Sequence, residues 1–215
     1  MDLDGPILDT RRRHHACYAQ ILGAHGCDPL DVQTYWNLKR KRMGVAELLA
    51  KGGCKVVPSA DFERRWARLI EQPRFLELDV VQPGALAQLR DWKRAGFHLI
   101  LASMRQNSRT ARRQLRALEI AELFSAVTFS PPEGGAEGKA AGVISVMPSR
   151  AMPSVWIGDT EADMMAARIA GFHRIAVTCG IRSRALLAAT NPDLLVPRLA
   201  SIRRRQLDSL RGRPR

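Results

Sequence analysis

Short apolar runs and longer stretches of helical spacing alternate along the second half of the chain. Helices are predicted at 85–95, 108–118 and 161–170, with Ser108 as an N-cap and with Gly96 and Gly171 as stop signals. The apolar runs of strand length lie at 97–102, 126–129, 155–158, 174–178 and 194–196. This alternation is typical of a parallel sheet with covering helices. It predicts an α/β fold with a doubly wound sheet.

The segment from 12 to 78 differs, because it contains helical patterns and no convincing strand. After Ser59, the residues Phe62, Trp66 and Leu69 recur at the i, i+4, i+7 spacing of one buried helix face. We therefore predict a discontinuous α/β core (1–11 and 79–215), an all-helical insert (12–78) and a basic tail (203–215). An insert at this point is expected over the carboxyl ends of the strands, where α/β folds bind ligands.

The 215 residues are enough to bury a hydrophobic core, and the net charge of +13 is strongly basic, with 28 arginines and 6 lysines. Such an excess suits polyanionic partners, including small phosphorylated molecules. A compositional bias toward scattered surface arginine, with no such partner, explains the excess better. The sequence shows no basic segment interleaved with base-stacking aromatic residues, which argues against nucleic acid as a partner.

The four cysteines Cys17, Cys27, Cys54 and Cys179 show no C-x-x-C spacing and no paired framework, which favours a reducing interior. No apolar run approaches the roughly 20 residues that span a bilayer. The amino end lacks the hydrophobic stretch of a signal peptide. These features predict a cytoplasmic protein, monomeric or homodimeric, without a membrane partner.

Acidic motifs lie near the amino end and after the run at 155–157. In Asp2-Leu3-Asp4-Gly5, the first carboxylate is a candidate nucleophile for phosphoryl groups, and the second is a candidate proton donor and acceptor. In Gly158-Asp159-Thr160-Glu161-Ala162-Asp163, Asp159 and Asp163 are candidate ligands for Mg²⁺, which prefers carboxylate oxygens. The simpler alternative is that these acids only favour a helix start through its dipole.

Two further residues fit phosphate chemistry. Ser103 ends an apolar strand and could donate a hydrogen bond to a phosphoryl oxygen. Lys139, in a loop-like Glu137-Gly138-Lys139, could neutralise charge that develops there. Each feature alone is more typical of an ordinary turn or of a solvated side chain. Their order along the chain is what points to a shared site.

With these motifs in this order, the chain resembles the haloacid dehalogenase superfamily, in particular its phosphoglycolate phosphatase-like members with a helical cap. The resemblance implies that Asp2 is both nucleophile and metal ligand, and that Asp4 is the acid/base and gives a backbone carbonyl to the metal. It further implies that Ser103 and Lys139 bind phosphate, and that Asp159 and Asp163 complete a Mg²⁺ site. Dehalogenases of the superfamily lack the second carboxylate, so Asp4 favours phosphoryl chemistry.

The chain departs from the family pattern at three places. Pro6 stands where threonine is common, and Ala140 stands where a proline usually follows the lysine. The family's first aspartate ends a central strand, yet only Met1 precedes Asp2. We therefore expect the first core strand to be missing or truncated, either because the natural chain begins upstream or because this chain is a compromised remnant.

The sequence predicts a Mg²⁺-dependent phosphatase that acts on a small phosphorylated metabolite through an aspartyl phosphate. One alternative is a sugar-phosphate mutase of the same superfamily. The other is a non-catalytic basic protein that keeps the fold and binds nucleic acid through its positive charge.

Overall fold

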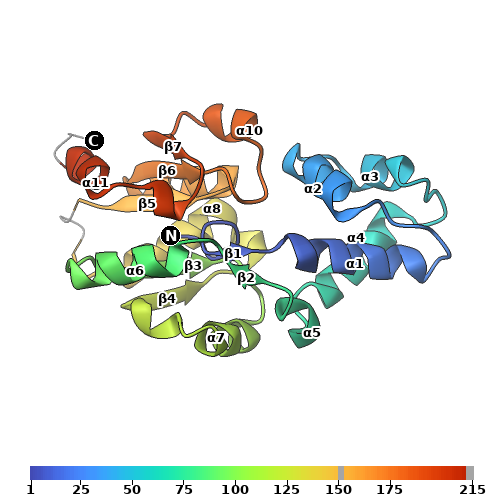
Figure 1. Ribbon diagram of the computed structural model, residues 1–215, viewed down its shortest axis with the longest axis horizontal. Coiled ribbons are helices and arrows are strands. Elements are labelled where there is room, and N and C mark those ends of the chain that lie inside the picture. Colours follow the sequence, from blue (N-terminus) through green and yellow to red (C-terminus); the bar gives the residue numbers. More distant parts are fainter. Residues whose placement is uncertain (150–152, 212–215) are drawn as a thin grey trace. The chain divides into compact units, whose positions relative to one another are not determined.

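The computed structural model describes residues 1–149 and 153–211, and the chain forms two compact units (Figure 1). One unit contains Met1–Asp9 and Val81–Arg215, and the other contains Thr10–Val80. The sequence placed these boundaries at 11/12 and 78/79. Two short strands, β1 (Leu8–Asp9) and β2 (Val80–Val81), pair with each other close to the division.

The first unit is built on parallel strands. Strand β3 (Ile100–Ser103) pairs with β4 (Ala126–Phe129). Strand β5 (Val155–Gly158) pairs with β6 (His173–Val177), which also pairs with β7 (Leu194–Val196). All of these pairs are parallel, so the carboxyl ends of the strands lie at one edge of the sheet.

Met1 and Asp2 join the two groups of strands. The amino group of Met1 donates to the Ile100 carbonyl at 2.8 Å, and the Ala102 amide donates to the Met1 carbonyl at 2.8 Å. On the other side, the Asp2 amide donates to the Ile157 carbonyl at 2.9 Å. These bonds follow the parallel pattern, so two residues take the position of a strand between β3 and β5.

A cavity of about 190 Å³ lies where that strand would extend toward its amino end. Met1 lines it together with residues of β3 and β5, and the aromatic side chains of Trp92, Phe97 and Trp156 contribute to its wall. Leu207 also lines it. Two residues therefore occupy a central strand position, and a cavity lined by apolar and polar residues lies beside them.

Helices pack against both faces of the sheet. On one face, α6 (Ala85–Arg94), α7 (Ser108–Ala117) and α11 (Arg204–Arg211) join a core cluster that includes Leu101 and Ile157. On the other face, α8 (Gly135–Ser145) and α9 (Glu161–Ala170) pack with Ala102 and Trp156. The short helix α10 (Arg184–Ala188) adds Leu187 to a small cluster with Ala176. This arrangement confirms the predicted α/β class. Short 3₁₀ turns lie at Ala121–Leu123, Pro132–Gly134 and Leu199–Ser201.

Most predicted elements of this unit are present, with shifted ends. The prediction that Ser108 caps its helix is wrong, because the side chain of Asn107 accepts the Thr110 amide at 3.0 Å and Ser108 is the first helical residue. Lys139, expected in a loop, lies within α8. The predicted basic tail begins with α11, and its residues 212–215 lie outside the described residues.

The second unit is helical, with α1 (Arg11–Gly23), α2 (Val32–Arg40), α3 (Val45–Lys51), α4 (Ser59–Leu69) and α5 (Pro73–Leu76). Its core contains Tyr18 and Tyr35, whose rings stack with centroids 4.6 Å apart. Phe62 is buried in the same core, and Trp66 and Leu69 pack against it, as the spacing along the chain predicted.

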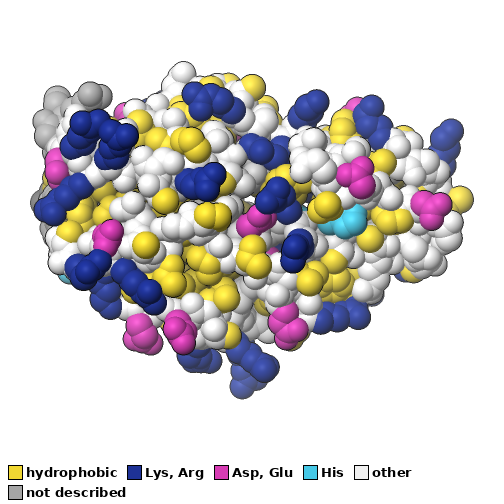
Figure 2. All heavy atoms as spheres, in the orientation of Figure 1, with side chains coloured by type: hydrophobic (Ala, Val, Ile, Leu, Met, Phe, Trp, Pro, Cys, Tyr) yellow, Lys and Arg dark blue, Asp and Glu magenta, His cyan; other side chains and the backbone are white. Residues whose placement is uncertain are grey.

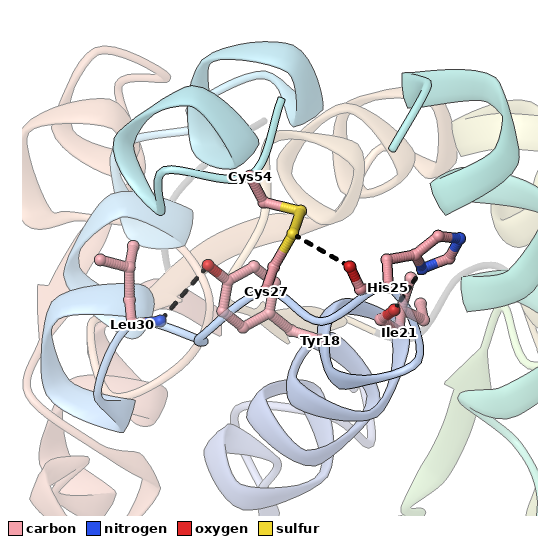
Figure 3. Close-up of a disulfide and its surroundings, with 6 residues drawn as sticks. All are labelled: Tyr18, Ile21, His25, Cys27, Leu30 and Cys54. Carbon is pink, nitrogen blue, oxygen red and sulfur yellow. Dashed lines mark hydrogen bonds between the residues drawn. A yellow bond between two sulfur atoms is a disulfide. The ribbon is translucent and has the colours of Figure 1, made fainter. Parts of the chain in front are cut away.

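The cysteine prediction is wrong for one pair, because Cys27 and Cys54 form a disulfide in this helical unit (Figure 3). Cys27 follows the end of α1, and Cys54 follows the end of α3. Their Cα atoms are 5.6 Å apart although 27 residues separate them in sequence. Tertiary packing of the two helix ends produces this proximity, and no local spacing could reveal it. Cys17 and Cys179 are free thiols.

Among the described residues, no helix combines the length and apolar character needed to cross a membrane. Figure 2 shows lysine and arginine side chains spread over the visible face, with acidic and apolar groups between them. On this face the basic residues follow the scattered pattern that a compositional bias produces.

Candidate active site

The most buried charges of the first unit meet at the carboxyl ends of the central strands. The Nζ atom of Lys139 donates to Oδ1 of Asp2 and to Oδ1 of Asp163, each at 2.7 Å. Only 3% of the Lys139 side chain is exposed, and Asp163 is fully buried. The ammonium group therefore links residues that lie 161 positions apart in the sequence and belong to different elements.

Asp163 is held on both of its oxygens. Its Oδ2 atom accepts hydrogen bonds from the Thr160 hydroxyl at 2.6 Å and from the Asp159 amide at 3.3 Å. The Thr160 hydroxyl also accepts the Asp163 amide, which completes a capping box at the start of α9. The Trp156 indole donates to Oδ1 at 3.4 Å. Asp163 thus fixes the start of the helix and the lysine at the same time.

Asp159 follows β5 and lies in a space that two glycines leave open. A Cβ atom at Gly5 would come within 2.3 Å of the Asp159 carboxylate, and one at Gly180 would come within 1.8 Å of its Oδ2. Oδ2 accepts the Ile181 amide at 2.6 Å. Oδ1 is buried and has no hydrogen-bond partner. A buried carboxylate oxygen without a partner is costly unless a cation or a proton compensates it.

The electrostatics of these groups depend on one another. Burial and repulsion from Asp163 raise the pKa of Asp2, against the pull of Lys139. Burial, followed by repulsion from Asp2 and Asp163, raises the pKa of Asp159 well above its ordinary value. Burial alone would raise the pKa of Asp163, but the contact with Lys139 outweighs it and holds that pKa low.

Lys139 keeps its charge in spite of its burial. Burial lowers the pKa of its ammonium group, but the carboxylates of Asp163 and Asp2 outweigh this and raise it. The group is therefore a permanent cation at neutral pH. It compensates one carboxylate charge. Burial and mutual repulsion raise the pKa of Asp2 and of Asp159, so further positive charge nearby would stabilise their ionised forms.

The acidic cluster fits a hard divalent cation. Asp2, Asp159 and Asp163 each offer a carboxylate oxygen, and these atoms lie within 4.8 Å of one another. Because both oxygens of Asp163 already accept protein hydrogen bonds, Asp2 and Asp159 have the oxygens best suited to direct contact. One or two carboxylates with additional waters is the usual protein contribution to a Mg²⁺ site.

Asp4 lies in the loop after the nucleophile candidate and is fixed by an arginine that the sequence did not single out. Arg105 donates from Nε to Oδ2 of Asp4 at 3.1 Å and from Nη2 to Oδ1 at 2.5 Å. Gly5, with φ of 96°, allows the turn that follows, and the Gln82 amide group donates to its carbonyl at 3.0 Å. Asp4 is partly exposed, whereas the arginine is buried.

Ser103 is buried at the end of β3, at the same edge of the sheet as Asp2 and Asp159. Its Oγ atom accepts a hydrogen bond from the Arg105 amide at 3.4 Å. The structure therefore brings Asp2, Lys139, Asp159 and Asp163 into direct contact or close proximity. It places Ser103 and Asp4 on neighbouring segments, which Arg105 connects.

The family profile of haloacid dehalogenase-like hydrolases matches residues 1–171, which is most of the chain. The chain belongs to the haloacid dehalogenase-like hydrolases. A search of curated proteins finds no match.

Solved structures of haloacid dehalogenase-like and related proteins share the fold. A haloacid dehalogenase-like family protein from Streptococcus pneumoniae is 21% identical, with 92% of each chain covered and a TM-score of 0.70. A predicted phosphoglycolate phosphatase from Haemophilus somnus is 17% identical, with 93% of this chain and 92% of that chain covered and a TM-score of 0.67. A provisionally named β-phosphoglucomutase from Thermotoga maritima is 20% identical, with 97% and 95% covered and a TM-score of 0.62.

One departure of this haloacid dehalogenase-like chain has a simple structural reason. In the loop after Asp4, the backbone bonds use the amides of Gly5, Ile7 and Leu8, so Pro6 occupies a position from which no donor is needed. Sequence reasoning missed Arg105 and Gly180, for which the chain carries no local signal. It also missed the role of Thr160, although T-x-x-D before a helix is a readable capping pattern.

Proposed function

We propose that this hydrolase is a Mg²⁺-dependent phosphatase that acts on a small phosphorylated metabolite through an aspartyl phosphate. One observation carries the proposal: Lys139 bridges Asp2 and Asp163, while the neighbouring Asp159 keeps a buried oxygen without a partner. That combination of charges suits a site for a divalent cation and a phosphoryl group. An ordinary helix start does not need a buried lysine and three converging acids.

Asp2 and Asp159 would hold the cation directly, and Asp163 would act through water or by orienting its neighbours. Bound Mg²⁺ would screen the repulsion between the carboxylates and the phosphoryl oxygens and would polarise the phosphorus–oxygen bonds. Lys139 would contribute a fixed positive charge to the same oxygens, because its pKa stays high. The Ser103 hydroxyl would donate a hydrogen bond to one phosphoryl oxygen.

The reaction would proceed in two displacements at phosphorus. A carboxylate oxygen of Asp2 would attack the phosphorus atom, and the bond from phosphorus to the ester oxygen would break. The Asp4 carboxyl group would give its proton to the departing oxygen. It would then accept a proton from the water that attacks the aspartyl phosphate, and the products would be inorganic phosphate and a regenerated Asp2 carboxylate.

A phosphomutase uses the same first displacement and differs only in the acceptor of the second one. The fold likeness to the provisionally named β-phosphoglucomutase does not separate the two reactions, because the phosphatase neighbours share that fold. The product does separate them. A mutase returns the phosphoryl group to its sugar, whereas a phosphatase releases it as inorganic phosphate.

The test is hydrolysis of p-nitrophenyl phosphate, followed by a panel of sugar phosphates, nucleotides and phosphoglycolate, each with Mg²⁺ and with EDTA. We expect phosphate release only with Mg²⁺ and none from Asp2→Asn. The exposed residue Asp208 offers a matched control, because Asp208→Asn makes the same chemical change away from the site and leaves activity intact. Activity that survives Asp2→Asn would reject the proposed nucleophile.

A further inference from the structure

The side chain of Arg105 makes polar contacts in the first unit that the reaction above does not use. Arg105 lies in the loop between β3 and α7, and only 4% of its side chain is exposed. Its Nε and Nη2 atoms face the two oxygens of Asp4 at 3.1 and 2.5 Å, and its Nη1 atom donates to Oε1 of Gln114 at 2.5 Å. All three nitrogens of the guanidinium group are therefore engaged.

A two-point contact between a guanidinium group and a carboxylate fixes the relative orientation of the two groups as well as their distance. The guanidinium plane and the carboxylate plane align when both oxygens are bound, so the rotation of the Asp4 side chain is restricted. Gln114 belongs to α7, and its contact holds the guanidinium group from the side away from Asp4. A lysine at this position would offer a point charge and no fork.

The backbone of Arg105 reaches the second chemical element of the site. Its amide donates to the Ser103 hydroxyl at 3.4 Å, while its side chain holds Asp4. One residue thus connects the hydroxyl that faces phosphate in the proposed reaction with the carboxyl group that transfers protons. The burial of its charge is costly unless its partners are kept.

We propose that Arg105 is a positioning residue that sets the orientation of the Asp4 carboxyl group for proton transfer, with Gln114 as its support on α7. The inference rests on the proposed phosphatase function and adds to it a residue outside the acidic cluster. Arg105 acts through Asp4, so its effect falls on turnover. Binding of the phosphoryl group, which depends on Lys139 and Ser103, is affected little.

Variants at Arg105 and Asp4 test this link. We expect Arg105→Ala to lower kcat about 10- to 100-fold, which is part of the roughly 10²- to 10⁴-fold that general acid–base catalysis contributes, with less than about a threefold change in KM. Arg105→Lys should recover part of kcat, and added guanidinium chloride at low millimolar concentration should recover part of it in the alanine variant. The control Arg109→Ala removes an exposed arginine near the start of α7 and should leave kcat unchanged.

The decisive comparison uses the Asp4→Asn background. If Arg105 works through Asp4, Arg105→Ala should change the residual kcat of Asp4→Asn by less than about twofold, because non-additivity marks residues that act as a unit. If Arg105→Ala lowers kcat equally in the unsubstituted protein and in Asp4→Asn, the inference is overturned. A rise in KM without a fall in kcat would overturn it as well. If Arg105→Ala does not fold, Arg105→Lys and Gln114→Leu replace it in the same comparison.

The outcomes separate this inference from the function on which it rests. An unsubstituted protein without phosphatase activity on any substrate of the panel would reject both. Mg²⁺-dependent activity that is lost in Asp2→Asn, together with additive effects at Arg105 and Asp4, would keep the phosphatase and reject the positioning role alone.

Discussion

The cavity beside Met1 leads to a quantitative prediction about stability. We expect that four apolar residues, Val-Ile-Val-Phe, joined ahead of Met1 will continue the shortened strand between β3 and β5. In a strand, the N–H and C=O groups of one residue point to the same side. The carbonyls of Ile100 and Ile157 accept hydrogen bonds from Met1 and Asp2, so the amides of Ile100 and Ile157 face the same space. Trp92, Phe97 and Leu207 supply apolar contacts in a wall that also contains polar groups, and about 190 Å³ of space is present.

The magnitude follows from opposing contributions. Burial of four apolar side chains stabilises by about 6–12 kcal/mol at about 1.5–3 kcal/mol each. Ordering four backbone units costs about 4–8 kcal/mol. The midpoints of the two ranges differ by about 3 kcal/mol in favour of burial, which corresponds to a rise in Tm of about 6–12 °C for a chain of this length. The new peptide bond also removes a buried amino group, whose pKa is lowered to about 5 by burial and by Lys139.

Differential scanning calorimetry measures the change, and hydrogen exchange at the Ile100 and Ile157 amides reports where it occurs. The matched control is an extension of equal length, Gly-Ser-Gly-Ser, which has the same peptide bond and no apolar side chains. If both extended proteins melt at the temperature of the starting chain, the cavity is not a strand position and the reasoning fails.

Three other measurements probe the site and the helical unit. Gly180→Ala should displace the Asp159 carboxylate and weaken Mg²⁺ binding about tenfold or more in calorimetric titrations, whereas Gly23→Ala, which meets no neighbour, should not. Burial raises the pKa of the Asp2 and Asp159 carboxylates, so protons compete with the cation for them. The rise in Tm caused by Mg²⁺ should therefore grow from pH 5.5 to pH 8. A rise in Tm that is independent of pH would contradict this expectation. Reduction of Cys27–Cys54, or Cys27→Ser, should destabilise the helical unit by about 3–4 kcal/mol in urea unfolding, and identical midpoints with and without reductant would refute it.

Local patterns of apolar and polar residues predicted the fold because helices and strands each bury residues at a characteristic spacing. The runs at 126–129, 155–158 and 194–196 became strands with the same bounds. Parallel strands place their carboxyl ends at one edge, so residues that follow different strands could be expected to meet. Asp2 and Asp159 lie near each other for this reason, and the prediction needed no knowledge of loops.

The features that the sequence did not reveal depend on tertiary contacts. Arg105 is one of 28 arginines, and only the position of the β3–α7 loop brings it to Asp4. The pairing of Cys27 with Cys54 depends on how two helix ends pack. Lys139 was expected in a loop, in Glu137-Gly138-Lys139, yet the helix places it in the core with two carboxylates that offset its burial.

The contact of Lys139 with two of the three clustered acids also fixes the ionic balance of the site. When Asp2, Asp159 and Asp163 are all ionised, one ammonium leaves two negative charges, and a single divalent ion would bring the cluster to electroneutrality. A monovalent ion would leave the cluster with a net negative charge, which would repel a phosphate dianion. In the proposed phosphatase, a lysine that need not touch the metal would therefore favour a divalent ion over a monovalent one.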